Sequence, residues 1–197
     1  SARVAPLARR APDYGVETGD VSVDMEIVRR RKREVVDDWS EGSRKGLEAR
    51  DHLDLIHGTG RFTGPHAIEV VDDDGAVTHR LRASHIFINV GGRPLIPPIE
   101  GLDDTDYLTS ATIMELDRVP EHLIVLGGGF VGLEFAQMFR RFGADVTVVE
   151  AGPRIAGKED PDVSEAMTGI LREDGITIRA GVRAVRASQT EDGIVEL

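Results

Sequence analysis

Three glycines and one glutamate have the spacing of a dinucleotide-binding turn. Gly127, Gly129 and Gly132 form the pattern G-x-G-x-x-G, and Glu150 follows 23 residues after the first glycine. In such a turn the first glycine permits a tight bend, the second lets the backbone approach a pyrophosphate, and the third lets a helix pack on a strand. A carboxylate at the position of Glu150 accepts both hydroxyls of an adenosine ribose. These residues predict a dinucleotide-binding site.

The segments around the glycines have the patterns of a strand, a helix and a second strand. Leu123–Leu126 and Val146–Val149 are short apolar runs, which are typical of buried parallel strands. Gly143 suits the C-terminal cap of the helix between them. Apolar residues recur there at helical spacing and should pack on the sheet: Val131, Phe135, Met138 and Phe142. The unit is therefore a Rossmann-like βαβ unit.

Phe130 and Glu134 lie four residues apart at the start of this helix. Residues at that spacing are neighbours on one helix face, so both should point outward together. An acid in the first turn interacts favourably with the helix dipole, which by itself explains Glu134, and Phe130 has an ordinary packing role available. From spacing alone, the structural explanation is favoured over a functional one.

Composition limits the remaining possibilities. The 197 residues carry a net charge of −11 and 40% hydrophobic residues, which indicates a folded globular protein that does not bind nucleic-acid phosphates. No stretch approaches the roughly 20 apolar residues of a membrane span, and no signal peptide is visible, so we expect a cytoplasmic protein. The chain has no cysteine, and its six histidines lack metal-binding spacing; we expect no disulfide, thiolate nucleophile or metal site.

The N-terminal half shows one long helix followed by strands. Helical periodicity runs from Asp24 to about Arg50, and the basic run Arg29–Arg33 is interpreted as its solvated face. The apolar stripe expected to be buried comprises Met25, Val28, Val35, Val36 and Trp39. Strand-like runs follow at Leu53–Ile56, Ala67–Val71, Val77–Leu81 and Ile86–Val90. Asp72–Gly75 is a good hairpin turn, so the sequence predicts a small antiparallel β-meander.

The C-terminal segment continues the alternation of helix and strand. A helix is expected from about Asp162 to Glu173, followed by β-like runs at Thr177–Ile178 and Val182–Val185. The fold class is therefore α/β, with a Rossmann-like βαβ domain and a separate meander. The absence of a starting methionine and the abrupt last strand pattern suggest that the chain is the central part of a longer protein.

The whole chain resembles the flavoprotein (pyridine nucleotide) disulfide oxidoreductases, and most closely their mercuric-reductase-like branch. The resemblance rests on HGTGRFTG at 57–64, IFINVGGRPLIPPIEGL at 86–102, the segment from Tyr107 through the glycine turn, and VTVVEAGPRI from 146. It implies residues 1–118 as a partial FAD-binding domain and 119–197 as a C-terminally truncated NAD(P)-binding domain. The parent is then an FAD- and NAD(P)-dependent oxidoreductase, expected to be a homodimer, and the fragment alone is expected to be inactive.

The resemblance also assigns site residues. It implies that Phe130 covers the flavin and moves aside for nicotinamide, and that Glu134 pairs with a lysine near the flavin. With the resemblance, a functional role is therefore favoured over a structural one for both residues. The nicotinamide dinucleotide would contact Gly127, Gly128, Gly129, Phe130, Val131, Gly132, Leu133, Glu134, Glu150 and the backbone near Ala184. FAD would approach Gly60, Val90, Gly91 and Gly92. Val90 departs from the threonine usual at its position.

One alternative function stays open, and another is excluded by the sequence. The family's first FAD glycine fingerprint, its cysteine pair and the following lysine, and its His-Pro base are not in this chain, so the electron-accepting substrate cannot be assigned. A stand-alone nucleotide-binding or redox-sensing module is the alternative. A short-chain dehydrogenase needs Tyr-x-x-x-Lys, but Thr18 follows Tyr14 and Ala111 follows Tyr107 at that spacing.

Overall fold

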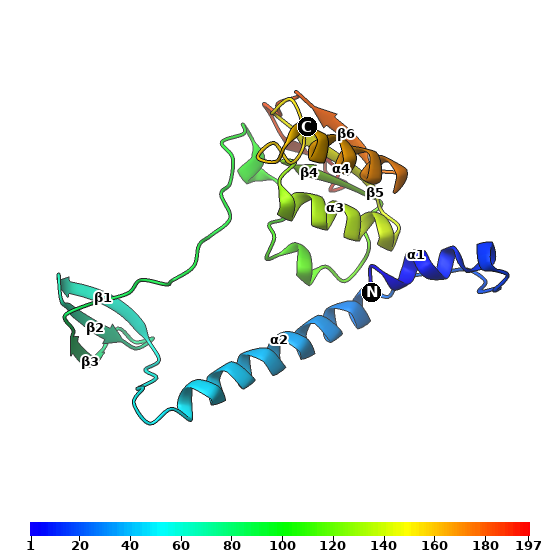
Figure 1. The fold of residues 1–197 in the computed structure, drawn as a ribbon. Coiled ribbons are helices and arrows are strands. Elements are labelled where there is room, and N and C mark those ends of the chain that lie inside the picture. Colours follow the sequence, from blue (N-terminus) through cyan, green and yellow to red (C-terminus); the bar gives the residue numbers. More distant parts are fainter. The chain divides into compact units, whose positions relative to one another are not determined.

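The computed structural model describes residues 1–197, which form two compact units (Figure 1). One unit comprises residues 34–93, and the other comprises residues 1–33 together with 94–197. The division predicted between residues 118 and 119 stays a prediction.

The larger unit contains a parallel sheet with its strands in the order β4-β5-β6. Strand β4 (His122–Leu126) leads into helix α3 (Phe130–Phe142) and then into β5 (Asp145–Glu150). Helix α4 (Pro161–Glu173) connects β5 to β6 (Thr177–Ala180). Both strand pairs are parallel, and the two helices lie beside the sheet in Figure 1. The predicted βαβ unit, the α4 helix and the α/β fold class are confirmed.

Helix α3 packs on the sheet through a face slightly rotated from the predicted one. Its buried residues are Leu133, Ala136, Phe139 and Phe142. Of the predicted stripe only Phe142 is buried, Phe135 and Met138 lie at the margin of the core, and Val131 is 55% exposed. At the start of the helix, a methyl group on Gly132 would lie 3.1 Å from Cγ1 of Val125 of β4, so the backbone approaches that strand closely. The rings of Phe139 and Phe142 meet edge to face at 5.7 Å, a favourable aromatic geometry.

Polar contacts at its C-terminal end fix α3 against the end of α4. The Asp174 carboxylate accepts hydrogen bonds from Gln137 (2.7 Å) and Arg141 (3.1 Å). Arg140 donates to the backbone carbonyls of Asp174 and Ala144. The C-cap is Gly143, as predicted, with a φ of 122°, a conformation that favours glycine. These contacts hold the helix whose other end carries the glycine turn.

The remaining elements of the larger unit are short: α1 (Val4–Arg9), η1 (Ala11–Tyr14), η2 (Leu102–Asp104), η3 (Ile113–Glu115), β7 (Ser188–Gln189) and β8 (Val195–Glu196). The predicted strand at Val182–Val185 is wrong. That segment has no strand partner, and instead the next residue, Arg186, forms an isolated bridge with Glu100. Ala187 donates its N–H to the carbonyl of Glu100 at 2.8 Å.

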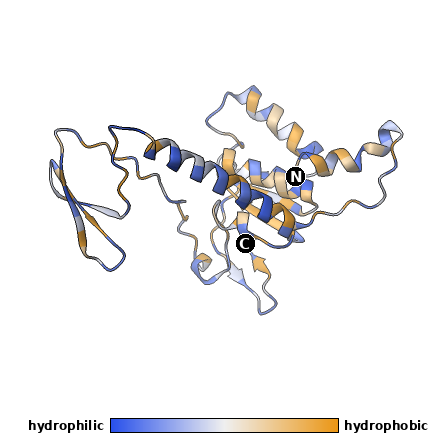
Figure 2. Ribbon diagram, turned by 90° about the horizontal axis from the view of Figure 1, so that it is seen from below, coloured by the Kyte–Doolittle hydropathy of each residue, from blue (hydrophilic) through white to orange (hydrophobic).

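Helix α2 (Met25–Glu48) agrees with the predicted helix, and the Asp24 side chain accepts the N–H of Ile27 at its start. The predicted buried stripe is largely wrong. Met25 is buried and Val28 packs at the core margin, but Val35, Val36 and Trp39 are 51%, 54% and 77% exposed. Periodicity indicates that a helix has an apolar face but not which element covers that face. No strand of the smaller unit covers Val35, Val36 or Trp39. The helix is mainly hydrophilic in Figure 2, and no helix of the chain has the length and apolar character needed to cross a membrane.

The basic run on α2 is not simply a solvated face, as predicted. Lys32 and Arg33 both form ion pairs with Glu115 of η3, and Arg29 donates to the Glu115 carbonyl at 2.9 Å. Hydrogen bonds from these two cations lower the pKa of the Glu115 carboxyl to about 2, and the bond from Lys32 has the larger effect. The start of α2 is thereby attached to the segment that precedes β4.

The smaller unit contains the predicted antiparallel meander, with its strands in the order β1-β2-β3. The strands are β1 (Thr59–Gly64), β2 (Ala67–Val71) and β3 (Val77–Arg82). The Asp72 side chain accepts the backbone N–H groups of Asp74 and Ala76, which closes the predicted hairpin turn. Two predicted strands are wrong: Leu53–Ile56 and Ile86–Val90 have no strand partner. The glycine-rich β1 takes the position next to β2 instead.

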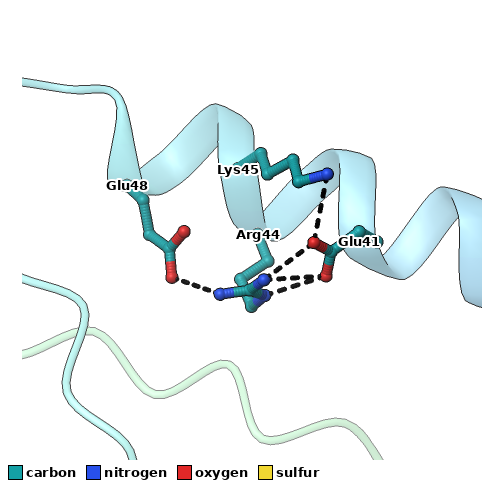
Figure 3. Close-up of polar contacts among 4 residues, drawn as sticks. All are labelled: Glu41, Arg44, Lys45 and Glu48. Atoms are coloured by element: carbon teal, nitrogen blue, oxygen red, sulfur yellow. Dashed lines mark hydrogen bonds and ion pairs between the residues drawn. The ribbon is translucent and has the colours of Figure 1, made fainter.

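The C-terminal part of α2, which belongs to the smaller unit, carries a ladder of ion pairs (Figure 3). Arg44 pairs with Glu41 at 2.8 Å and with Glu48 at 2.6 Å, and Lys45 also reaches Glu41. Hydrogen bonds from Arg44 and then Lys45 lower the pKa of the Glu41 carboxyl. Pairs at these spacings stabilise an exposed helix.

Candidate nucleotide-binding site

The glycine turn lies at the carboxyl end of β4, where ligands bind in open parallel sheets. Gly127 follows β4 directly and has a φ of 101°. Its N–H donates to the carbonyl of Val149 at 2.8 Å, which continues the pairing with β5. A side chain is strained at such a φ. The structure therefore gives Gly127 the tight-turn role that the pattern indicates.

Gly132 and Gly129 have opposite surroundings. A methyl group on Gly132 would lie 2.6 Å from the Gly127 carbonyl oxygen and 3.1 Å from Cγ1 of Val125. At Gly129 the same methyl group would meet no atom within 4 Å. Gly129 is also the N-cap of α3, without a side-chain cap, and its own N–H makes no hydrogen bond. The open space at Gly129 thus borders the unpaired N–H groups of the first helical turn.

Glu150, at the end of β5, lies beside the turn and is half-buried. Its Oε2 accepts the N–H of Gly128 at 2.6 Å, and its Oε1 accepts the N–H of Gly152. The sequence pattern indicates the position of this carboxylate but not these bonds. A carboxylate has about four acceptor positions, so two remain for hydroxyl groups.

Sequence reasoning placed a loop between β5 and α4 but assigned it no contact with the glycine turn. The fully buried Ile155 packs on Gly128, where a methyl group would lie 2.8 Å from its Cγ2. The N–H of Ala156 donates to the Gly128 carbonyl at 2.7 Å. Ser164 of α4, itself buried, donates to the Ile155 carbonyl at 2.7 Å. The only available signal was one isoleucine within a polar loop rich in glycine and proline.

The other residues predicted around the turn differ in exposure. Phe130 and Val131 are each 55% exposed, and Glu134 is also exposed. Phe130 and Glu134 therefore both reach solvent from the first turn of α3. Leu133 is 4% exposed and belongs to the core, so only its backbone is accessible to a ligand.

Backbone contacts hold the segment after β6 beside Glu150. Gly181 donates its N–H to the Gly152 carbonyl at 2.7 Å, and Val182 donates to the Glu150 carbonyl at 3.1 Å. Ala184 follows two residues later and is half-buried. A neighbouring cavity of about 390 Å3 lies among residues of α4, β6 and the loop after β5, and none of the predicted site residues lines it.

The residues predicted to approach FAD all lie in the smaller unit. Gly60 lies within β1, opposite Val70. Val90 is 88% exposed, and Gly91 and Gly92 lie in a segment without regular structure, with nothing within 4 Å of a methyl group on either one. No hydrogen bond joins Gly60 to these residues. Their contact with a flavin stays a prediction.

Comparison with known families decides the relationship of the chain. Residues 6–197 match the family described as pyridine nucleotide-disulphide oxidoreductase. The chain belongs to this family. The mercuric-reductase-like resemblance is also confirmed, because the chain is 40% identical to a mercuric reductase of Streptomyces lividans over 184 residues, 92% of the chain and 38% of that protein.

Other members of the family match similarly. A dihydrolipoyl dehydrogenase of Bacillus subtilis (strain 168) is 33% identical over 97% of the chain and 42% of its own length. The structure of the HOCl-induced flavoprotein disulfide reductase RclA from Escherichia coli has a TM-score of 0.76 and 30% identity, covering 97% of this chain and 41% of that one. The chain thus spans about two-fifths of the length of these relatives.

Proposed function

We propose that the chain is part of an FAD-dependent NAD(P)H oxidoreductase and that its own task is to bind the nicotinamide dinucleotide. The observation that carries this proposal is the open space at Gly129, bordered by unpaired helix amides and by the Glu150 carboxylate. When bound, the reduced nicotinamide supplies a hydride, and the parent's flavin is its acceptor. The members of the family to which the chain is similar include flavoprotein reductases by name.

The residues of the turn divide the binding between them. The N–H groups of Gly129, Phe130 and Val131 hold the pyrophosphate, because the first amides of a helix have no internal partner and the helix dipole favours an anion there. Glu150 accepts the adenosine ribose hydroxyls through its two remaining acceptor positions. The backbone near Ala184 borders the adenine.

Phe130 and Glu134 act at the nicotinamide end. Both are exposed on the first turn of α3, next to the pyrophosphate donors. Phe130 covers the site when the nucleotide is absent and turns aside when it binds. Glu134 holds a cation of the parent close to the reacting ring. These two are the proposed catalytic residues of this chain.

The residues that reduce the final acceptor lie outside the chain, and we assign no step to Gly60 or to residues 90–92. A stand-alone nucleotide-binding module is the competing function. Titration of the full-length parent with NADH, followed by NADH oxidation with and without added FAD, separates the two. Binding with FAD-dependent oxidation supports the oxidoreductase. Binding without oxidation supports the module, and absence of binding contradicts both.

A further inference from the structure

The backbone of Gly128 is fully occupied by the protein itself. Its N–H donates to Glu150 Oε2 at 2.6 Å, and its carbonyl accepts the N–H of Ala156 at 2.7 Å. The residue is buried. Although Gly128 stands in the middle of the glycine turn, its amide is therefore unavailable to a phosphate, unlike that of Gly129.

The partners of Gly128 belong to one loop, residues 151–160, together with Glu150 at its start. The side chain of Ile155 fills the space over the Gly128 α-carbon, and Ser164 of α4 fixes the Ile155 carbonyl. Ala156 has a φ of 47° and is the only non-glycine residue with a positive φ. A conformation that is unfavourable for alanine is kept because its neighbours hold it in place.

Glu150 completes this arrangement through its charge. Its two oxygens accept N–H groups from different loops, Gly128 in the glycine turn and Gly152 in the loop after β5. Hydrogen bonds to a carboxylate are stronger than those between neutral groups. One side chain thus links the glycine turn to the loop after β5.

We propose that Glu150 is a positioning residue for the glycine turn, in addition to the ribose-binding role on which the proposed function rests. The carboxylate fixes Gly128 before a nucleotide arrives, so that the Gly129 and Phe130 amides are already directed at the pyrophosphate position. Pre-organisation of this kind lowers the ordering cost of binding. A residue that only bound ribose would leave the nucleotide-free turn unchanged.

The test measures hydrogen exchange in the nucleotide-free full-length protein, by mass spectrometry of peptides that cover Gly127–Gly132. We expect Glu150→Ala to accelerate exchange of the hydrogen-bonded turn amides, those of Gly127 and Gly128, by about tenfold or more, because loss of a charge-assisted bond raises local opening. Glu150→Gln should be intermediate, since an amide oxygen accepts one N–H while its NH2 group cannot accept the other. Glu173→Ala, an exposed acid at the end of α4, is the matched control and should leave the turn unchanged.

Thermal melting of each variant identifies any global unfolding, and Glu150→Gln is the less disruptive substitution. Equal exchange of the turn in wild type, Glu150→Ala and Glu150→Gln would overturn the positioning role. Acceleration equal across every peptide would also overturn it. The exchange measurement uses no nucleotide and therefore tests only the positioning role. The proposed function fails separately, if wild-type protein does not bind NADH.

Discussion

The α-carbon of Gly132 lies so close to Gly127 that a methyl group there would stand 2.6 Å from the Gly127 carbonyl oxygen. The three glycines of the motif therefore differ in their roles: Gly127 and Gly132 are needed for packing, and Gly129 is not. Gly127 and Gly132 allow the turn and the helix to pack together, whereas the missing side chain of Gly129 leaves room for a ligand at the surface. This difference can be measured with substitutions that add the same single methyl group.

Gly132→Ala should destabilise the protein, and Gly129→Ala should not. Overpacking against backbone typically costs about 1–3 kcal/mol, whereas a methyl group in open space changes stability by about 0.5 kcal/mol or less. Gly129→Ala should instead weaken NADH binding, because its methyl group occupies the pyrophosphate position. Melting temperatures and NADH titrations of the two variants check this. Equal stability of both variants would contradict the packing role of Gly132.

The ion pairs of Glu115 predict a pH-dependent contribution to stability. Hydrogen bonds from Lys32 and Arg33 lower its pKa from 4.5 to about 2. A carboxyl with a lowered folded-state pKa stabilises the protein above pH 4.5, and this stabilisation is lost as the pH falls toward 2.

Glu115→Gln should therefore lower the melting temperature at pH 7, and the difference from wild type should shrink between pH 4.5 and 2. High salt should reduce the difference, since these side chains are accessible to solvent. Thermal melts across this pH range measure the effect. Glu173→Gln, which removes an exposed acid without an ion pair, serves as the control. A difference that is constant with pH would show that the ion pairs contribute nothing.

How much the sequence alone predicts depends on how local each feature is. The glycine turn, its flanking strands and the position of Glu150 follow from short-range spacing, and they are confirmed as elements of the fold. The contact of Ile155 with Gly128 is tertiary and leaves no periodic signal. Periodicity indicated an apolar stripe ending at Trp39, but burial requires a second surface that no pattern names. Strand β1 was missed because its glycines have low β propensity.

Cofactor preference should depend on Glu150. A 2′-phosphate about 4 Å from this carboxylate would be repelled by about 1 kcal/mol in water and about 4 kcal/mol at a partly buried site, roughly fivefold to a thousandfold in affinity. Arg154, four residues further on, donates through Nη2 to the Gly157 and Glu159 carbonyls, and would reduce this repulsion only by turning toward the phosphate. We expect NADH to bind the parent more tightly than NADPH, and Glu150→Ala to narrow the gap. Equal affinities in wild type would refute this role.

The purified chain should bind FAD weakly or not at all. Residues 90–92 lie in an exposed segment without regular structure, and such a segment must be ordered before it can contribute to binding. Purification followed by flavin absorbance, with and without added FAD, measures the occupancy. A yellow preparation with stoichiometric flavin would show that these residues assemble a site after all.

The most direct test of the central claim, that the N-terminus of α3 binds the nicotinamide dinucleotide, is a crystal structure of the full-length protein with NADH. The account predicts pyrophosphate oxygens within hydrogen-bond distance of the Gly129 and Phe130 amides. It also predicts adenosine ribose hydroxyls on Glu150, with the Gly128 N–H still donating to that carboxylate. A dinucleotide bound elsewhere, for example in the cavity beside Arg172, or a pyrophosphate on the Gly128 amide, would contradict it.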